Sequence, residues 1–122
     1  MPPVKKLPAR FYRQTSGNEP VREWLKRLTP DERRVIGKDI QKVEFGWPIG
    51  LPVCRPLGEG LWEVRSDLPS QRTARVIFCI VDGQMILLHG FIKKTRKTPK
   101  RDVAIARERK AETEQQAEEA EQ

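Results

Sequence analysis

Apolar residues in the first half of the chain change from a loose alternation to a helical period. The segment from Val4 to Tyr12 alternates loosely and contains Pro8, which predicts an edge strand, because an edge leaves some backbone donors unpaired. Beyond it, apolar residues recur every three or four positions and predict two amphipathic helices. The predicted buried positions are Val21, Trp24, Leu25 and Leu28 in the first helix, and Val35, Ile36, Ile40, Val43 and Phe45 in the second.

Cap signals define the ends of both helices. Asn18 is the predicted cap of the first helix, and Pro20 lies in its first turn. The second helix begins at Thr29, because Thr29 and Glu32 have the spacing of a capping box around a proline at the first helical position. Gly46 ends it. The two helices together predict a helical hairpin.

After Gly46 the pattern becomes that of short strands separated by proline and glycine. Asp82 and Gly83 have the composition of a tight hairpin turn. An α+β fold follows, with a mostly antiparallel sheet, the helical hairpin packed on one face, and a C-terminal helix. The predicted strands are Val53–Leu57, Leu61–Ser66, Thr73–Val81 and Met85–Ile92.

The segment after Pro99 consists of strong helix formers with few apolar positions. From Ala111 it contains five glutamates and no cation, so we expect residues 111–122 to be a frayed or disordered acidic tail and residues 1–110 to be the folded domain. The tail has two interpretations, a solubilising end or a screen over a cationic groove.

Charge is distributed unevenly along the 122 residues. The chain has a net charge of +7, but residues 1–98 alone have +9. An excess of this kind attracts polyanions such as nucleic acid, although it also serves solubility alone. The N-terminus lacks the apolar run of a signal peptide, which predicts a cytoplasmic protein. Cys54 and Cys79 belong to no metal-binding motif, so we expect two buried reduced thiols.

Six cations occupy the nine positions from Lys93 to Arg101, directly after an apolar strand. A solvated face usually has mixed charges, whereas this run contains no acid. Arg65 and Arg75 lie on the two strands of a predicted hairpin, so their guanidinium groups and the lysines could form one phosphate site. The alternative is that each arginine pairs with a nearby acid, Arg65 with Glu63 or Asp67.

His89 is the only histidine, on an apolar strand, where a structural role is the more common one. The chain has no metal-ligand spacing and no glycine-rich phosphate loop, so no metal and no cofactor are predicted. The cations from Lys93 to Arg101, together with Arg65 and Arg75, could support RNA cleavage without a metal. In that reaction the 2′-hydroxyl attacks the adjacent phosphate, and cations align the strand and neutralise charge.

Three sequence segments carry a family resemblance: LWEVR, ARVIF and ILLHGFIKKTRKTPKRDVAIARER. Over about residues 4–110 they resemble the RelE/ParE superfamily of type II toxins, specifically its HigB-like, phage-derived branch. The resemblance implies a RelE-like fold and an endoribonuclease that cleaves mRNA, with the ribosome as a further partner, and so inhibits translation. It also implies a helix-turn-helix antitoxin as the partner protein.

The resemblance also implies roles for individual residues. Arg65, Arg75, Lys93 and Lys94 are the expected catalytic residues, and His89, which matches a histidine common in this branch, is a further candidate. The expected RNA-binding residues are Lys93, Lys94, Thr95, Arg96, Lys97 and Lys100. Thr98 matches a family threonine without an assigned role. Two other functions remain open: a non-catalytic module that binds RNA or an antitoxin, and a ParE-like gyrase inhibitor.

Overall fold

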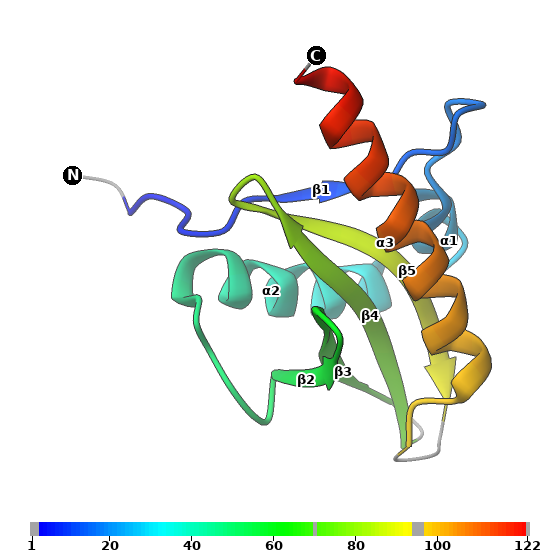
Figure 1. Cartoon of the computed structure of the whole chain (residues 1–122). Helices are drawn as coiled ribbons and strands as arrows, with labels where there is room; N and C mark the ends of the chain where they lie inside the picture. Colours follow the sequence, from blue (N-terminus) through cyan, green and yellow to red (C-terminus); the bar gives the residue numbers. More distant parts are fainter. Residues whose placement is uncertain (1–2, 70, 94–96, 122) are drawn as a thin grey trace.

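Five strands form one sheet in the part of the chain that this computed structural model describes, residues 3–69, 71–93 and 97–121 (Figure 1). The strand order is β1-β5-β4-β3-β2, with β1 parallel to β5 and the other neighbours antiparallel. The predicted α+β class is confirmed. The elements are β1 Ala9–Phe11, α1 Pro20–Lys26, α2 Pro30–Gly46, β2 Cys54–Gly58, β3 Leu61–Leu68, β4 Arg72–Val81, β5 Gln84–Lys93 and α3 Lys100–Ala120.

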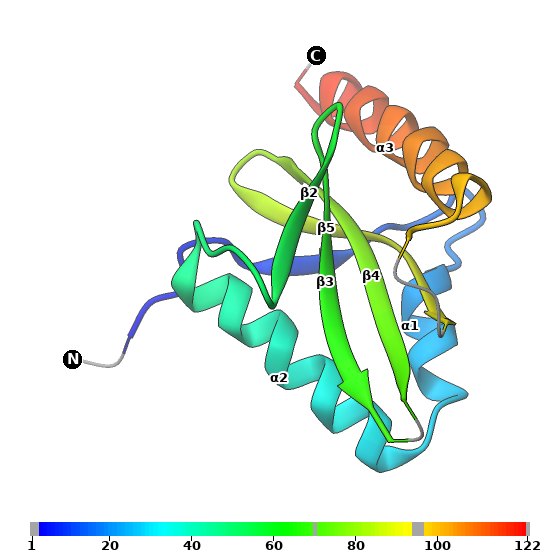
Figure 2. The same ribbon diagram turned by 90° about the horizontal axis from the view of Figure 1, so that it is seen from below.

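Helices cover both faces of the sheet, with α1 and α2 on one face and α3 on the other (Figure 2). Successive residues of β4 alternate between two cores, as the pleat of a strand requires. The core on the α1 and α2 side includes Val21, Ile36, Val43, Val76 and Phe78. The core beneath α3 includes Leu61, Ile77, Cys79, Leu88 and Ala106.

The capping box of α2 and the β4–β5 turn are confirmed. The Thr29 side chain accepts a hydrogen bond from the backbone N–H of Glu32, and the Glu32 carboxylate accepts one from the backbone N–H of Thr29. Asp82 and Gly83 have φ angles of 51° and 72°, which is the conformation of a two-residue hairpin turn. Both signals depend on residues within four positions of one another.

Asn18 does not cap α1, so that prediction is wrong. The N-cap is Glu19, and it makes no side-chain capping hydrogen bond. Proline is favoured at the first helical position because the missing N–H would have no partner there, and Pro20 therefore makes the preceding residue the cap. The Asn18 carbonyl instead accepts a hydrogen bond from the Gln14 N–H and closes a turn before the helix.

The first strand lies at the sheet edge as predicted, but it is shorter than Val4–Tyr12. The backbone N–H groups of Lys6 and Leu7 donate to the Glu44 carbonyl in α2, and the N–H of Ala9 donates to the Glu44 carboxylate at 2.7 Å. These donors therefore bond to the end of α2, and strand pairing begins only at Ala9.

The acidic tail differs from its prediction, because α3 continues as a helix to Ala120. The Tyr12 hydroxyl donates to the Glu112 carboxylate, and Gln116 donates to the Arg13 carbonyl. Burial, reinforced by the bond to Glu112, raises the pKa of Tyr12 to about 12. Contacts with the segment after β1 therefore order a part of the chain that has few apolar residues of its own.

Both cysteines are buried and free, as predicted, and they lie on opposite faces of the sheet. Burial raises the pKa of each thiol to about 11. Both side chains therefore contribute to packing as small uncharged groups.

Gly90 of β5 lies directly beneath the Trp24 ring of α1, where an added Cβ would overlap the ring. We expect Gly90→Ala to destabilise the protein by about 1–3 kcal/mol, because the ring must move out of its packed position. Gly37→Ala is the matched control, since nothing lies within 4 Å of the added Cβ and alanine favours the helix. Urea unfolding measures both, and equal midpoints for the two variants would contradict this packing.

Candidate functional site

Three rows of side chains cross the α3 face of the sheet. Residues directly opposite one another in an antiparallel ladder project from the same face, so the strand register determines these rows. The rows are Arg55, Glu63, Ile77 and His89; then Arg65, Arg75 and Phe91; then Asp67, Thr73 and Lys93. The three rows contain residues of β2, β3, β4 and β5, and they meet β5 at His89, Phe91 and Lys93, near its C-terminal end.

Arg65 and Arg75 are directly opposite each other on β3 and β4. The prediction that the hairpin makes them neighbours is confirmed, while their chemical roles stay a prediction. Like charges directly opposite one another are destabilising. A compensating charge is therefore needed close to this pair.

Glu63 is that compensating charge, and it is fully buried. Its carboxylate pairs with Arg55 at 2.7 Å and accepts a hydrogen bond of 2.6 Å from the Thr98 hydroxyl. Thr98 in turn accepts hydrogen bonds from Arg55 at 3.1 Å and from Arg75 at 3.2 Å. We call Arg55, Glu63, Arg65, Arg75 and Thr98 the arginine cluster.

Sequence reasoning missed Arg55 and the role of Glu63 as its partner. Alternation along β3 places Glu63 and Arg65 on one face, and Glu63 was considered only as a partner of Arg65. The β2–β3 register, with its irregularity between Pro56 and Gly58, decides that Arg55 lies opposite Glu63. The sequence therefore indicated that Glu63 lies on the same face as Arg65, but it did not indicate that Arg55 is the partner of Glu63.

The three arginines differ in their access to solvent. Arg75 has no exposed surface, whereas the Arg55 side chain is 32% exposed and Arg65 is half-buried. Arg65 also lines a cavity of about 330 Å³ between α2 and the edge of β3, together with Asp39 and Lys42. A ligand can therefore reach Arg55 and Arg65 directly, while Arg75 lies underneath.

The arginine cluster has an excess of positive charge. Burial lowers the pKa of Arg75, Glu63 opposes this shift, and the neighbouring Arg65 and Arg55 add to it. The Nε atoms of Arg55 and Arg65 are buried without a hydrogen-bond partner among the described residues. Because three guanidinium groups surround one described carboxylate, the cluster suits an anion that contacts the partly exposed side chains of Arg55 and Arg65.

A second group of polar residues surrounds Asp102 in the first turn of α3. Its carboxylate contacts His89 Nε2 at 2.7 Å and lies 4.0 Å from the Lys93 ammonium. Burial lowers the pKa of His89 below its usual value near 6.5, although Asp102 opposes the shift; Arg109 and Arg101 lower it further. The sequence analysis identified His89 and Lys93 as candidates but did not identify Asp102.

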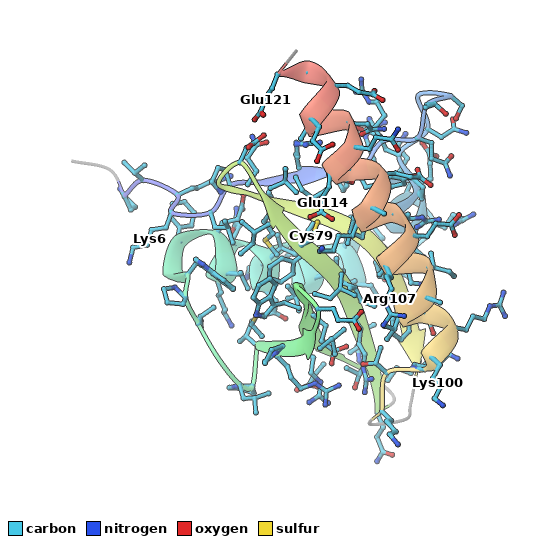
Figure 3. The ribbon with its side chains drawn as sticks, in the orientation of Figure 1. Lys6, Cys79, Lys100, Arg107, Glu114 and Glu121 are labelled. Atoms are coloured by element: carbon cyan, nitrogen blue, oxygen red, sulfur yellow. The ribbon has the colours of Figure 1, made fainter. Side chains whose placement is uncertain are left out.

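The cationic run lies where β5 ends and α3 begins. Lys93, Lys97 and Lys100 are exposed, and Figure 3 shows Lys100 projecting from the start of α3. The other predicted members, Lys94, Thr95 and Arg96, lie outside the described residues. The structure therefore brings Lys93 to the His89 and Asp102 group and Thr98 to the arginine cluster.

The described residues hold neither a metal-binding cluster nor a helix that could span a membrane. Residues 3–69, 71–93 and 97–121 contain no group of three or more His, Cys, Asp and Glu side chains that could hold a metal ion. Within the same ranges, no helix has the length and apolar character needed to cross a bilayer.

The Thr98 hydroxyl should be important for stability, because it connects one acid to two arginines. We expect Thr98→Val to lower the free energy of unfolding by about 1–3 kcal/mol, since the buried Glu63 carboxylate loses a donor. Thr98→Ser keeps the hydroxyl and should stay within about 1 kcal/mol of the parent protein. Urea unfolding measures both variants, and equal losses would show that the methyl group matters rather than the hydrogen bonds.

The pKa of His89 can be measured directly, because it is the only histidine. We expect an NMR titration to give a pKa below 6.5 and Asp102→Asn to lower it further, because the carboxylate favours the protonated ring. The unfolded chain then binds this proton more readily than the folded protein, so stability decreases as the pH falls below about 6.5. Asp82→Asn, in the exposed turn, is the control and should leave the titration unchanged.

The segment that contains these residues matches a known family. The chain matches the family model described as phage derived protein Gp49-like (DUF891) over residues 23–111, a segment that contains the arginine cluster and the Asp102 group. No curated protein matches the chain. The matched segment is more than half of the 122 residues, and the chain belongs to the Gp49-like family of phage-derived proteins, a RelE-like family of toxins from toxin–antitoxin systems.

Proposed function

We propose that this protein is an endoribonuclease toxin of the HigB-like branch, which cuts mRNA at the ribosome and is neutralised by a helix-turn-helix antitoxin. The observation that supports this proposal best is the arginine cluster, in which Arg55, Arg65 and Arg75 surround one described acid, Glu63. Membership in a toxin family implies an antitoxin partner.

The charge distribution of α3 supports a nucleic-acid ligand. A helix dipole favours acids in the first turn and bases in the last. The cations Lys100 and Arg107 lie in the first half of α3, whereas Glu114 lies in its second half and Glu121 is its C-cap, as Figure 3 shows. This order works against the dipole, and it concentrates positive charge beside the arginine cluster. Attraction of a phosphate backbone is a physical reason for such an arrangement.

In the proposed reaction, Arg55 and Arg65 bind the phosphate of the cleaved bond, and Lys93 neutralises charge beside it. Arg75 has a positioning role, because it is fully buried and acts through Thr98. The 2′-oxygen attacks phosphorus and the bond to the 5′-oxygen breaks. The products are a cyclic 2′,3′-phosphate and a 5′-hydroxyl, the latter formed when the leaving oxygen takes up a proton.

His89 is the candidate acceptor for the proton of the 2′-hydroxyl. An ionised Asp102 accepts a hydrogen bond from Nε2–H, which leaves Nδ1 with a free lone pair. The lowered pKa keeps the ring neutral at neutral pH, as a base requires. Asp102 would then fix the tautomer of His89.

The burial of Arg75 favours a second candidate function, a non-catalytic module that binds RNA or an antitoxin. A residue without exposed surface contributes to the architecture of a site without contacting the reacting phosphate. Such a module would stop growth without cut transcripts. A gyrase inhibitor on the same fold would instead leave DNA breaks.

Induced expression with mapping of 5′ transcript ends tests the proposal. Arg65→Gln and Lys93→Gln should restore growth and reduce cut ends about 10- to 100-fold, because each removes one charge-assisted phosphate contact. Arg34→Gln and Lys38→Gln, exposed residues of α2, are the charge-matched controls and should remain toxic. Circular dichroism confirms that each variant is folded. Toxicity without cut transcripts would contradict the nuclease, and so would unchanged cutting in both site variants.

A further inference from the structure

A second basic pocket lies on the other side of the start of α3. Strand β1 pairs only with Met85, Ile86 and Leu87, so the rest of β5 lies at the edge of the described sheet, flanked by α1 and α3. An opening of about 140 Å³ occurs there. It is lined by Pro20, Trp24, Arg27, His89, Gly90 and Arg109.

Two of the polar lining groups are held in place by other contacts. Arg109 donates from Nη1 to the Leu88 carbonyl at 2.8 Å, and its guanidinium lies 5.5 Å from the centre of the Tyr12 ring. His89 contacts Asp102 through Nε2 and stacks on Phe91 with a centroid separation of 5.6 Å. Both groups therefore line the pocket in defined orientations.

Arg27 contributes a second guanidinium from the end of α1. It is exposed, and it makes no ion pair with any described residue. No acid lines the pocket, and the Asp102 carboxylate, which contacts His89, is not one of the lining groups. Two guanidinium groups with no lining carboxylate favour an anion, and a planar fork of donors matches the oxygens of a phosphate.

The size of the pocket limits the ligand to a small group. Its volume corresponds to a few water molecules at roughly 30 Å³ each, which accommodates one phosphate group but not a whole nucleotide. Trp24 and Pro20 form apolar walls on one side. The ligand is therefore a phosphate whose attached groups extend out of the opening.

The pocket and the arginine cluster lie at the two ends of one crossing segment. Thr98 is bonded to Glu63 of β3, and four residues later Asp102 is bonded to His89 of β5. An RNA strand that contacts Arg65 and continues around the start of α3 reaches the pocket next. Lys93 lies at the same end of the sheet, beside Asp102.

We propose that Arg27 and Arg109, in the pocket that His89 also lines, bind the backbone phosphate of the RNA strand adjacent to the bond that is cut. The assignment to RNA rests on the proposed function, whereas phosphate binding itself does not. The guanidinium groups of Arg27 and Arg109 contact the phosphate. Trp24 shapes the opening through its packing on Gly90.

An NMR titration of the single His89 imidazole tests phosphate binding without any cleavage. Inorganic phosphate, compared with chloride at equal ionic strength, should give a saturable shift. Arg27→Gln should weaken binding about tenfold, because one charge-assisted hydrogen bond is lost. Arg22→Gln is the matched control on the same helix, because Arg22 is exposed and does not line the pocket. A non-saturable shift, or equal weakening in both variants, overturns the proposal.

A second titration uses a short RNA with 2′-O-methyl groups at every position, which cannot be cut. This RNA should shift the NMR signal of His89 in the parent protein and in Arg22→Gln. In Arg27→Gln the affinity obtained from the same titration should be about tenfold weaker. If inorganic phosphate binds but this RNA leaves His89 unchanged, the assignment to an RNA phosphate is overturned. If both bind while expressing cells contain no cut transcripts, the pocket stands and the nuclease proposal fails.

Discussion

The buried carboxylate of Glu63 is the constraint on which the candidate site depends. Arg65 and Arg75 are opposite each other on neighbouring strands, and Arg55 lies one strand further along. Three guanidinium groups in a poorly solvated place repel one another unless an acid compensates them. Glu63 does so with no exposed surface, by pairing with Arg55 and by accepting the Thr98 hydroxyl that also contacts Arg75.

The same network connects α3 to the sheet. Thr98 binds Glu63 just before the helix, and Asp102 binds His89 in its first turn, so two polar contacts fix the segment that carries Lys100 and Arg101. Further along, Arg107 pairs with Glu59 in the β2–β3 turn at 2.8 Å. The position of α3 therefore determines which cations lie beside the arginine cluster and which lie beside the pocket at the edge of β5.

Local signals predicted the elements of the fold well where each depends on chain neighbours. The capping box of Thr29, the Asp82–Gly83 turn and the alternation of the long strands all involve residues a few positions apart. The expectations for Val4 and the acidic tail were wrong or incomplete because distant groups decided them, whereas the cap moved from Asn18 to Glu19 because of the neighbouring Pro20. Glu44 of α2 takes the donors before β1, and Tyr12 holds a helix that is 100 residues away in sequence.

The sequence by itself determined the α+β class, the adjacency of Arg65 and Arg75 and the excess of cations after β5, since a short hairpin and a charge run are local properties. Only the tertiary structure decided that Arg75 is buried, that Arg55 and Thr98 complete its surroundings, and that Asp102 orients His89. These contacts join residues 13 to 43 positions apart. Their existence depends on strand register and on the placement of α3, which result from the packing of the whole chain and not from any one segment.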